Sequence, residues 1–488
     1  MVQKSLDDLK NKSLFKQQCF IDGQWLNADN GQVIQVVNPA TDEIIGTVPK
    51  MGGNETKRAI NAAQTAQIAW RKKTAKERSV ILRRWYELME ENKDDLALIL
   101  TLEQGKPLAE AKGEIQYGAS YLEWFAEEAK RVYGDTIPGH MADKRISVIK
   151  QPIGVTAAIT PWNFPNAMIT RKAGPALAVG CSMVLKPASM TPYSALALGV
   201  LAEEAGLPPG VFNIITGSSG EIGGELTSNS IVRKLTFTGS TEIGAQLIQE
   251  SAGTVKKLSM ELGGNAPFIV FEDADIDAAV EGAMMSKYRN AGQTCVCANR
   301  FYVHDSVYDQ FIEKFKHAVT KLKVGNGLNK DVTIGPLIDR NALKKVKEHI
   351  DDAVNKGATV VMGGKALEGC FFEPTILSNV PFNALVSKEE TFGPLAPVYR
   401  FETEEEVIHL ANDTEFGLAS YFYANDISRI TRVSEALEYG IVGINTGLIS
   451  NEMAPFGGIK ASGLGREGSK YGIDDYLEIK YLCLGIHL

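Results

Sequence analysis

Two short segments carry residue types that can do covalent chemistry. Cys295 closes a small, turn-prone stretch that begins at Asn290, and Glu261 stands just before the glycines Gly263 and Gly264. A thiol becomes a strong nucleophile only where its surroundings favour the thiolate. A covalent thiol intermediate then needs a base to activate the group that releases it. Cys295 and Glu261 are therefore candidates for a nucleophile and a general base.

The bulk composition narrows the class of protein. At 488 residues the chain is long enough for two or three domains, and 44% hydrophobic and 23% charged residues are typical of a soluble globular protein. The net charge of -8, without a basic block, gives no indication of nucleic-acid binding. The first residues lack the apolar core of a signal peptide, and no apolar run approaches the ~20 residues of a membrane span. We expect a cytoplasmic protein with neither nucleic-acid nor membrane partners.

The six cysteines indicate a reducing compartment. They are too sparse for a disulfide framework. Cys295 and Cys297 are separated by one residue, and no second cysteine or histidine pair follows at the spacing that zinc needs. We therefore expect no metal site.

Strands and helices alternate from about Val155 onward. We expect strands at 155–159, 182–185, 211–215 and 234–237, and a helix that Thr191 and Pro192 begin as N-cap and first residue. A second alternating region follows Gly264, with strands at 267–271 and 300–303. Such alternation predicts mostly parallel sheets covered on both faces, and these bind ligands at the carboxyl ends of their strands.

Three further segments have a pattern of their own. The segment 236–244 lies at a strand-to-helix junction, where backbone amides favour an anion such as a dinucleotide phosphate, although an ordinary turn explains it equally well. The segments 145–150 and 476–482 alternate as strands do but lie outside any strand-helix alternation. Both are candidates for pairing across subunits.

Seven motifs in a fixed order match one family. They are Pro-Trp-Asn-Phe-Pro at 161–165, Lys-Pro-Ala at 186–188, Gly-Ser-Thr at 239–241, Glu-Leu-Gly-Gly at 261–264, Gly-Gln-Thr-Cys at 292–295, Glu-Glu-Thr-Phe-Gly-Pro at 389–394 and Pro-Phe-Gly-Gly at 455–458. On these motifs the chain resembles the aldehyde dehydrogenases along nearly its whole length. Within that family the segments 293–300 and 463–472 are most similar to the NADP-dependent succinate-semialdehyde dehydrogenases.

The resemblance implies an α/β fold with three parts. A Rossmann-like cofactor domain is expected at 1–133 and 153–264, an α/β catalytic domain at 265–462, and a β oligomerisation arm at 134–152 and 474–488. Members of the family form dimers or tetramers, so a homotetramer or a homodimer is expected.

The resemblance also implies the catalytic roles. Cys295 would attack the aldehyde carbon, hydride would leave for the nicotinamide, and a thioester would remain. Glu261 would activate the water that releases the acid. Asn163 would stabilise the oxyanion together with the Cys295 backbone N–H. By residue type alone, a structural cysteine, a turn carboxylate and a turn asparagine remain open readings.

The cofactor residues also follow from the resemblance. Lys186 would bind the adenosine ribose, Glu390 the nicotinamide ribose and Ser240 the pyrophosphate, while Gly263 and Gly264 would let the backbone approach the nicotinamide. The remaining pocket positions would be Trp162, Gly239, Leu262 and Phe392. NAD-preferring relatives often carry a glutamate where this chain has Ser189, and serine removes its repulsion of a 2′-phosphate. NADP is therefore the expected cofactor, with NAD accepted.

Two arginines point to the substrate. Arg171 and Arg289 match positions where succinate-semialdehyde dehydrogenases hold the substrate carboxylate, and Ser450 matches a third contact. Guanidinium groups bind carboxylates bidentately. Succinate semialdehyde is the expected substrate. Glutarate semialdehyde stays open because a pocket discriminates one methylene by only ~1–3 kcal/mol, and ordinary ion pairs of the two arginines stay open as well.

Other functions remain to be weighed. Cys297 has no role in the basic mechanism, but its spacing suggests a strained disulfide with Cys295 that would silence the nucleophile in an oxidised cell. Glu261 argues against a coenzyme A-acylating enzyme, in which a thiol replaces water as the acyl acceptor and a base that activates water would be unfavourable. A thiol hydrolase would need a histidine brought in from a distant part of the chain, and a non-catalytic protein on this scaffold would not need the complete motif set.

Overall fold

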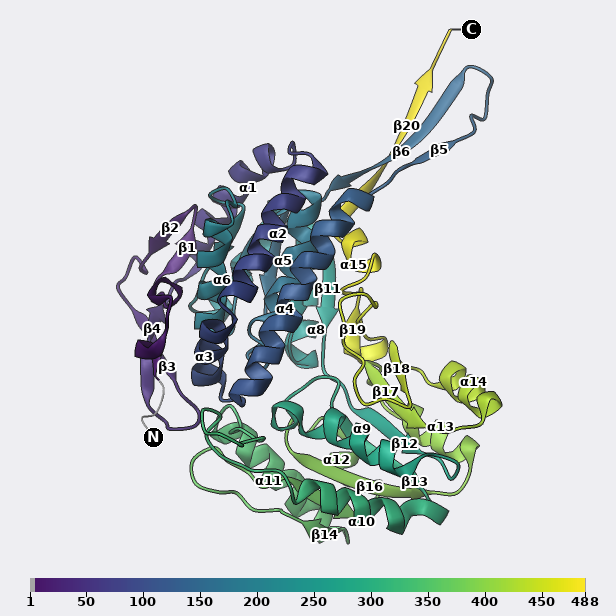
Figure 1. Cartoon of the computed structure of the whole chain (residues 1–488). Coiled ribbons are helices and arrows are strands. Elements are labelled where there is room, and N and C mark those ends of the chain that lie inside the picture. The colour runs from purple at the N-terminus through teal and green to yellow at the C-terminus, as the bar shows by residue number, and fades with distance from the viewer. Residues whose placement is uncertain (1–4, 488) are drawn as a thin grey trace.

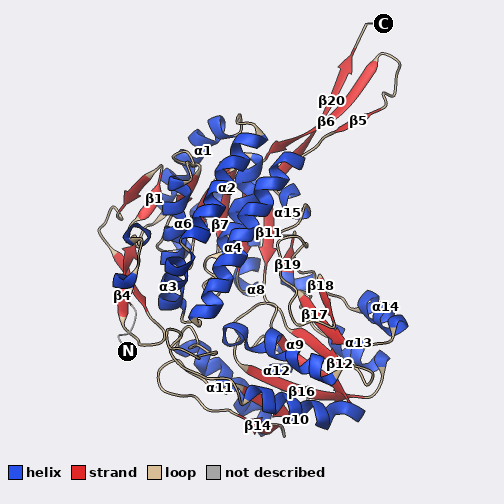
Figure 2. Ribbon diagram, in the orientation of Figure 1, coloured by secondary structure: helices blue, strands red, loops and turns tan. Residues whose placement is uncertain are grey.

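The chain folds around two separate, mostly parallel sheets, and a third sheet projects from the body (Figure 1). The computed structural model describes residues 5–487. Figure 2 shows helices packed along both large sheets, which confirms the expected α/β class. Among the described residues no helix is both long enough and apolar enough to span a membrane.

The first sheet has the strand order β19-β11-β10-β7-β8-β9-β1-β2. Its central strands are parallel, whereas β1, β2 and β19 pair in the antiparallel sense. The strands are β1 (Cys19–Ile21), β2 (Gln24–Leu26), β7 (Val155–Ile159), β8 (Ser182–Lys186), β9 (Phe212–Ile214), β10 (Val232–Thr238), β11 (Lys257–Glu261) and β19 (Gly463–Leu464). The helices of this part are α1 (Gly53–Trp70), α2 (Ala75–Glu91), α3 (Lys93–Gln104), α4 (Leu108–Glu128), α5 (Ala167–Val179), α6 (Pro192–Glu204), α7 (Ser219–Ser228) and α8 (Thr241–Ser251).

The second sheet has the order β14-β15-β16-β13-β12-β17-β18, and only β14 runs against its neighbour. The strands are β12 (Ala266–Val270), β13 (Ala298–His304), β14 (Thr359–Met362), β15 (Thr375–Ser378), β16 (Leu395–Phe401), β17 (Ala419–Tyr423) and β18 (Ile441–Ile444). The helices that follow in the chain are α9 (Ile276–Tyr288), α10 (Tyr308–Val319), α11 (Arg340–Asn355), α12 (Leu385–Lys388), α13 (Glu404–Asn412), α14 (Ile427–Ala436) and α15 (Tyr471–Asp474).

Each large sheet is buried on both faces. In the first sheet Met183 and Leu185 join one hydrophobic core, while Val184 between them joins another. This period of two places neighbouring side chains on opposite faces, so the strands read as continuous apolar runs. The predicted strands and the helix α6, with Pro192 as its first residue, are confirmed.

The chain passes from the first sheet to the second between β11 and β12. The short strand β19 returns to the edge of the first sheet. The boundaries of the expected domains stay a prediction. A separate two-stranded ribbon of β3 (Val33–Val37) and β4 (Ile44–Pro49) lies near the N-terminus.

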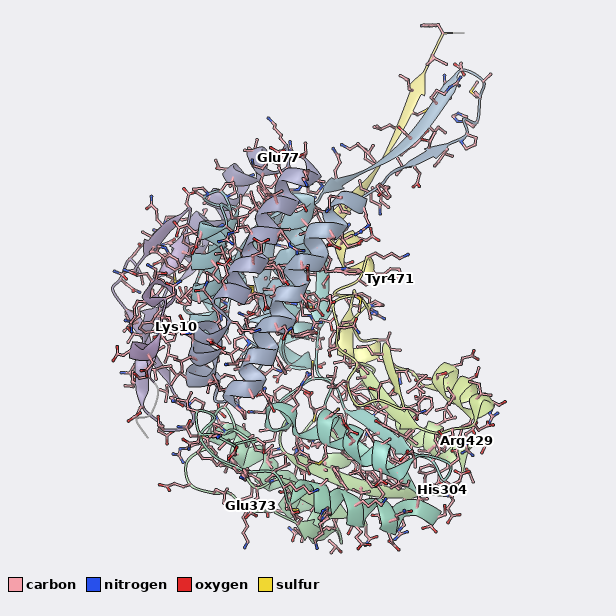
Figure 3. All side chains as sticks on the ribbon, in the orientation of Figure 1. Lys10, Glu77, His304, Glu373, Arg429 and Tyr471 are labelled. Carbon is pink, nitrogen blue, oxygen red and sulfur yellow. The ribbon has the colours of Figure 1, made fainter. Side chains whose placement is uncertain are left out.

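The projecting sheet is the expected arm. It consists of β5 (Asp135–Ile137), β6 (Lys144–Pro152) and β20 (Leu477–Gly485). The strands β6 and β20 contain the two segments that we considered for pairing across subunits, and here they pair with each other in register from Pro152 with Leu477 to Lys144 with Gly485. Figure 3 shows side chains standing out on both sides of this sheet. Its two edges, β5 and β20, are the edges left for another chain.

Candidate active site

A cavity of about 220 Å³ lies where loops from the two large sheets meet. Most of the predicted site residues line it, although they come from distant parts of the chain. They are Trp162, Asn163, Arg171, Gly239, Ser240, Leu262, Arg289, Cys295, Glu390, Phe392 and Ser450. Lys186, Ser189, Glu261 and Cys297 are not part of the wall.

Several wall residues escaped the sequence analysis. Phe164 and Phe456 lie inside two of the quoted motifs but were given no role. Met168 precedes Arg171 by three residues on α5, and that helical spacing puts both side chains on one face. Tyr117 comes from α4, which carries no motif, so no local signal marks it.

The nucleophile loop has an unusual backbone. Asn290 and Ala291 have positive φ angles of 51° and 55°, and Gly292 continues with 75°. Left-handed backbone is costly for residues other than glycine, so tertiary contacts must hold this turn. Cys295 is partly exposed into the cavity. Burial, opposed by the positive charge of Arg171, raises the pKa of Cys295 to about 12, so the resting thiol keeps its proton.

Gly264 brings the base-bearing segment against the nucleophile loop. A Cβ atom at this position would lie 2.6 Å from the Cys295 carbonyl oxygen, which no side chain tolerates. The Gly264 N–H also donates to Glu390 Oε1 at 3.2 Å. Glycine is therefore required here by the nucleophile loop of the same chain, and the approach of the nicotinamide to this backbone stays a prediction.

Asn163 sits buried with one amide hydrogen engaged. Its Nδ2 donates to the Gln293 carbonyl at 3.1 Å, and its Oδ1 accepts from the Phe164 N–H at 3.1 Å. A side-chain amide has two N–H donors. The second has no partner among residues 5–487 and is available to a ligand in the cavity.

Glu261 ends β11 and precedes the wall residue Leu262 in the chain. The side chain is buried, and neither carboxylate oxygen has a hydrogen-bond partner among the described residues. Burial, reinforced by the neighbouring Glu467 carboxylate, raises the pKa of Glu261 well above its ordinary value. Burial therefore favours the protonated carboxyl group, which must lose its proton to act as a base.

The two arginines on the wall differ in their charge partners. Arg171 is buried, and its Nη2 lies 2.9 Å from Glu467 Oε2, while its guanidinium lies 4.0 Å from the centre of the Phe456 ring. Arg289 has no ion-pair partner among residues 5–487, and its guanidinium lies 5.1 Å from the centre of the Phe164 ring. Arg171 thus has a carboxylate at ion-pair distance. Arg289 has none among the described residues, although the Glu110 carboxylate lies within its electrostatic reach.

The remaining cofactor candidates surround the ends of the first sheet. Lys186 ends β8 and is buried; its ammonium donates to the Pro187 carbonyl at 3.3 Å, and burial lowers its pKa to about 8. Ser189 stands in the following turn and is partly exposed. Ser240 is the N-cap of α8 and accepts from the Ile243 N–H at 3.5 Å.

Two aromatic side chains, Trp162 and Phe392, form part of the cavity wall. The Trp162 and Phe392 rings meet edge to face with centroids 5.5 Å apart. Phe392 has a φ of 56°, a conformation that a bulky residue adopts only under tertiary constraint. Burial raises the pKa of the nearby Glu390 to about 7. Three features together fit a dinucleotide: Lys186, which is buried without a carboxylate partner among residues 5–487, the N-terminus of α8, and the Glu390 carboxylate, of which Oε1 accepts from Gly264.

Comparisons with known proteins agree with this site. A model of the aldehyde dehydrogenase family matches residues 25–482. The chain belongs to the aldehyde dehydrogenase family. A glutarate-semialdehyde dehydrogenase of Pseudomonas aeruginosa is 74% identical over 98% of this chain and 99% of its own length. An NADP-dependent succinate-semialdehyde dehydrogenase of Escherichia coli is 70% identical over 98% and 100%. A crystal structure described as an Escherichia coli NADP-dependent enzyme superposes with a TM-score of 0.98 at 70% identity, over 98% of this chain and 100% of that one.

Two expectations about this aldehyde dehydrogenase are thereby confirmed. Its enzyme class is that of the NAD(P)-dependent aldehyde dehydrogenases, and its sequence resembles the succinate-semialdehyde members. The first relative named above carries the other semialdehyde in its name, so the family alone leaves the chain length of the substrate open.

Cys297 lies apart from the cavity of this aldehyde dehydrogenase. It is buried, its Sγ lies 3.4 Å from the Lys287 carbonyl oxygen, and both it and Cys295 are free thiols. Burial raises the pKa of Cys297 as well. A disulfide with Cys295 stays a prediction.

Proposed function

We propose that this aldehyde dehydrogenase oxidises succinate semialdehyde to succinate with NADP. The observation that carries the proposal is Arg289, a half-buried cation that has no ion-pair partner among residues 5–487 and lies on the wall of the cavity that also holds Cys295. A cation partly withdrawn from water favours an anion as its partner. A substrate with an aldehyde at one end and a carboxylate at the other would bring the aldehyde to Cys295 and the carboxylate to Arg289.

The other contacts support the same substrate class. Arg171 is held in place by Glu467 through Nη2 and presents a guanidinium whose Nε makes no hydrogen bond with the described residues. Ser450 adds a hydroxyl to the same wall. Together with Arg289, these groups form a clamp for the far carboxylate of the substrate.

Glutarate semialdehyde is a second candidate for the same clamp. The 74% identical relative is named for it, and the extra methylene changes binding by only ~1–3 kcal/mol. We expect turnover of both acids, with the shorter one preferred.

The chain's own residues account for the acyl chemistry. Cys295 first loses its thiol proton to solvent, and Sγ then bonds to the aldehyde carbon while the C=O electron pair moves onto the oxygen. The second Asn163 N–H and the Cys295 N–H stabilise the resulting oxyanion. NADP, when bound, supplies the acceptor for the hydride that leaves this carbon. Glu261, once deprotonated, takes a proton from the water that attacks the thioester, and the acid leaves.

The residues that would hold NADP are Lys186 and Ser189 at the adenosine end and Ser240 at the start of α8. The ammonium of Lys186 has no carboxylate partner among residues 5–487, and Ser189 brings no negative charge beside it. Both features favour a 2′-phosphate, as the name of the NADP-dependent relative also suggests. NAD is tolerated because none of these groups excludes it.

We also propose that the arm joins subunits into a homotetramer or homodimer. Apolar side chains on β20 are exposed, with Ile479 at 73% and Leu484 at 62%. Exposed apolar edge strands invite pairing with another chain. The unpaired cysteines support a reducing, cytoplasmic location.

Initial rates test the substrate proposal. Reduced cofactor is followed with succinate semialdehyde, glutarate semialdehyde and butanal, each with NADP and with NAD, on the wild type and on Arg289→Met. We expect the variant to lose ~10²-fold or more in kcat/KM for both acids and to keep its rate with butanal. A wild type that is poor on both acids and good on butanal would refute the substrate class and leave the dehydrogenase class standing.

A further inference from the structure

Asn290 connects the loop of the oxyanion donor to the loop of the nucleophile. Its side-chain Nδ2 donates to the backbone carbonyl of Asn163 at 3.0 Å and to that of Gln293 at 3.3 Å. Asn163 donates its own Nδ2 to the same Gln293 carbonyl at 3.1 Å. Asn163, Asn290 and Gln293 are thus all joined to one another by hydrogen bonds, and Gln293 stands two positions before Cys295.

This set is anchored to helices outside both loops. Gln104 Nε2, at the end of α3, donates to Asn290 Oδ1 at 3.0 Å, and the Asn290 N–H donates to Glu110 Oε2 on α4 at 2.9 Å. The ammonium of Lys106 donates to the Asn163 carbonyl at 2.8 Å. Gln104 and Lys106 are fully buried, so water does not compete for these bonds.

The backbone conformation of Asn290 indicates the role of its side chain. With φ 51° and ψ 36° the residue is left-handed, a conformation that glycine adopts more easily than asparagine. Glycine would therefore serve the turn better. What the asparagine side chain adds is the link between the two loops.

We propose that Asn290 is a positioning residue for the oxyanion site. It holds the Gln293 carbonyl on which one Asn163 N–H rests, and this aims the second N–H at the oxygen that gains charge on the substrate. Asn290 does not itself contact the substrate cavity. The inference rests on the oxyanion role of Asn163 in the proposed function.

A double-mutant cycle on kcat tests this role. Asn290→Gly keeps the left-handed backbone and removes the side chain, and Asn163→Ala removes the oxyanion donor. We expect Asn290→Gly to lose ~10–100-fold in kcat with KM changed by less than ~3-fold, since the lost interaction belongs to the transition state. In the Asn163→Ala background the same change should cost less than ~3-fold, because the residue then has no donor to aim.

A matched control separates positioning from stability. Asn213 is also fully buried and bonds three backbone groups, the Met183 and Gly210 carbonyls and the Asp22 N–H. Asn213→Ala should lower Tm and leave kcat unchanged. A loss of kcat in Asn290→Gly that Asn213→Ala reproduces at equal loss of Tm would overturn the proposal.

Two further outcomes are decisive. If the losses of Asn290→Gly and Asn163→Ala multiply in the double variant, Asn290 acts independently of Asn163 and the inference alone fails. If Asn163→Ala keeps full activity, the oxyanion role of Asn163 in the proposed function is refuted. The inference about Asn290 is then refuted as well, because it depends on that role. Should Asn290→Gly not fold, Gln104→Met goes through the same cycle with a smaller expected loss of about threefold to tenfold. This variant removes the bond to Asn290 Oδ1 together with the bond that Gln104 Oε1 accepts from the Lys106 N–H.

Discussion

Arg171 on α5 and Glu467 near the C-terminus form a buried ion pair, with 2.9 Å between Nη2 and Oε2, at the wall of the substrate cavity. The same carboxylate also receives the ammonium of Lys172 and lies close to Glu261. Burial raises the pKa of Glu467, but Lys172 and Arg171 outweigh this effect and hold that pKa below its ordinary value. Arg171 of the proposed substrate clamp and the proposed general base Glu261 therefore share one electrostatic neighbour.

Glu467→Gln should move the pH dependence of kcat to lower pH. The Glu467 charge helps to keep Glu261 protonated, and its removal leaves Arg171 and Lys172 to favour the ionised base. Because water activation needs that ionised form, the rise of kcat, measured from about pH 6 to about pH 10, should come earlier than in the wild type. Glu478→Gln removes the same charge on the exposed arm and should leave the midpoint in place. A midpoint in Glu467→Gln that stays or rises would contradict this prediction.

Alkylation of Cys295 should accelerate with pH without a plateau. Burial raises the pKa of Cys295 to about 12, so the thiolate fraction grows roughly tenfold for each pH unit between about 7 and about 9. Inactivation by iodoacetamide in the absence of cofactor measures this rate, with the modified peptide identified by mass. A rate that levels off below about pH 9 would show that the thiolate is stabilised more than its burial allows.

Glu261→Gln should separate the two halves of the reaction. The thioester would form at a near-normal rate but hydrolyse ~10²–10⁴-fold more slowly, because its water lacks a base. Rapid mixing with excess substrate should show a burst of reduced cofactor close to one per active site, followed by a slow steady state. Equal losses in the burst and in the steady state would place Glu261 in the first half of the reaction.

Ser189→Glu should shift cofactor preference from NADP toward NAD by about tenfold or more in the ratio of kcat/KM values. The new carboxylate would repel a 2′-phosphate and pair with Lys186. Ser189→Gln has the same size without the charge and should shift the ratio far less. Equal effects of the two variants would point to size rather than charge.

Mild peroxide should inactivate the wild type reversibly if Cys295 and Cys297 form a disulfide. Dithiothreitol should restore activity, and two free thiols per chain should disappear and return together. Cys297→Ala should lose this reversibility, because Cys295 then has no partner nearby. Inactivation and rescue that are identical in Cys297→Ala would argue against the disulfide.

The sequence predicts the contents of this site better than its internal contacts. Residue type and motif order single out Cys295 and Asn163, and the family resemblance singles out Arg289; all three line the cavity, and their roles stay predictions. The pairing of Arg171 with Glu467 joins segments far apart in the chain, and no local pattern encodes it. By residue type alone, Arg171 and Arg289 are equivalent. Among the described residues, the fold gives an ion-pair partner to Arg171 only.

The arm shows the same limit for the fold. Alternation correctly marks the segments within β6 and β20 as strands, because side-chain period is a local property. Their partner is not local. We considered pairing across subunits, and the structure pairs them with each other over nine residues of β20.

The C-terminal segment has a consequence for handling this protein. Only nine residues separate Glu467, whose charge balances Arg171, from the start of β20 at Leu477, and the short helix α15 lies between them. Truncation of the arm is therefore expected to disturb the Glu467–Arg171 ion pair as well. An affinity tag therefore belongs at the other terminus. A truncated chain that is both monomeric and inactive would give no evidence that subunits cooperate. The same truncation would have removed the arm and disturbed the ion pair of Glu467 with Arg171.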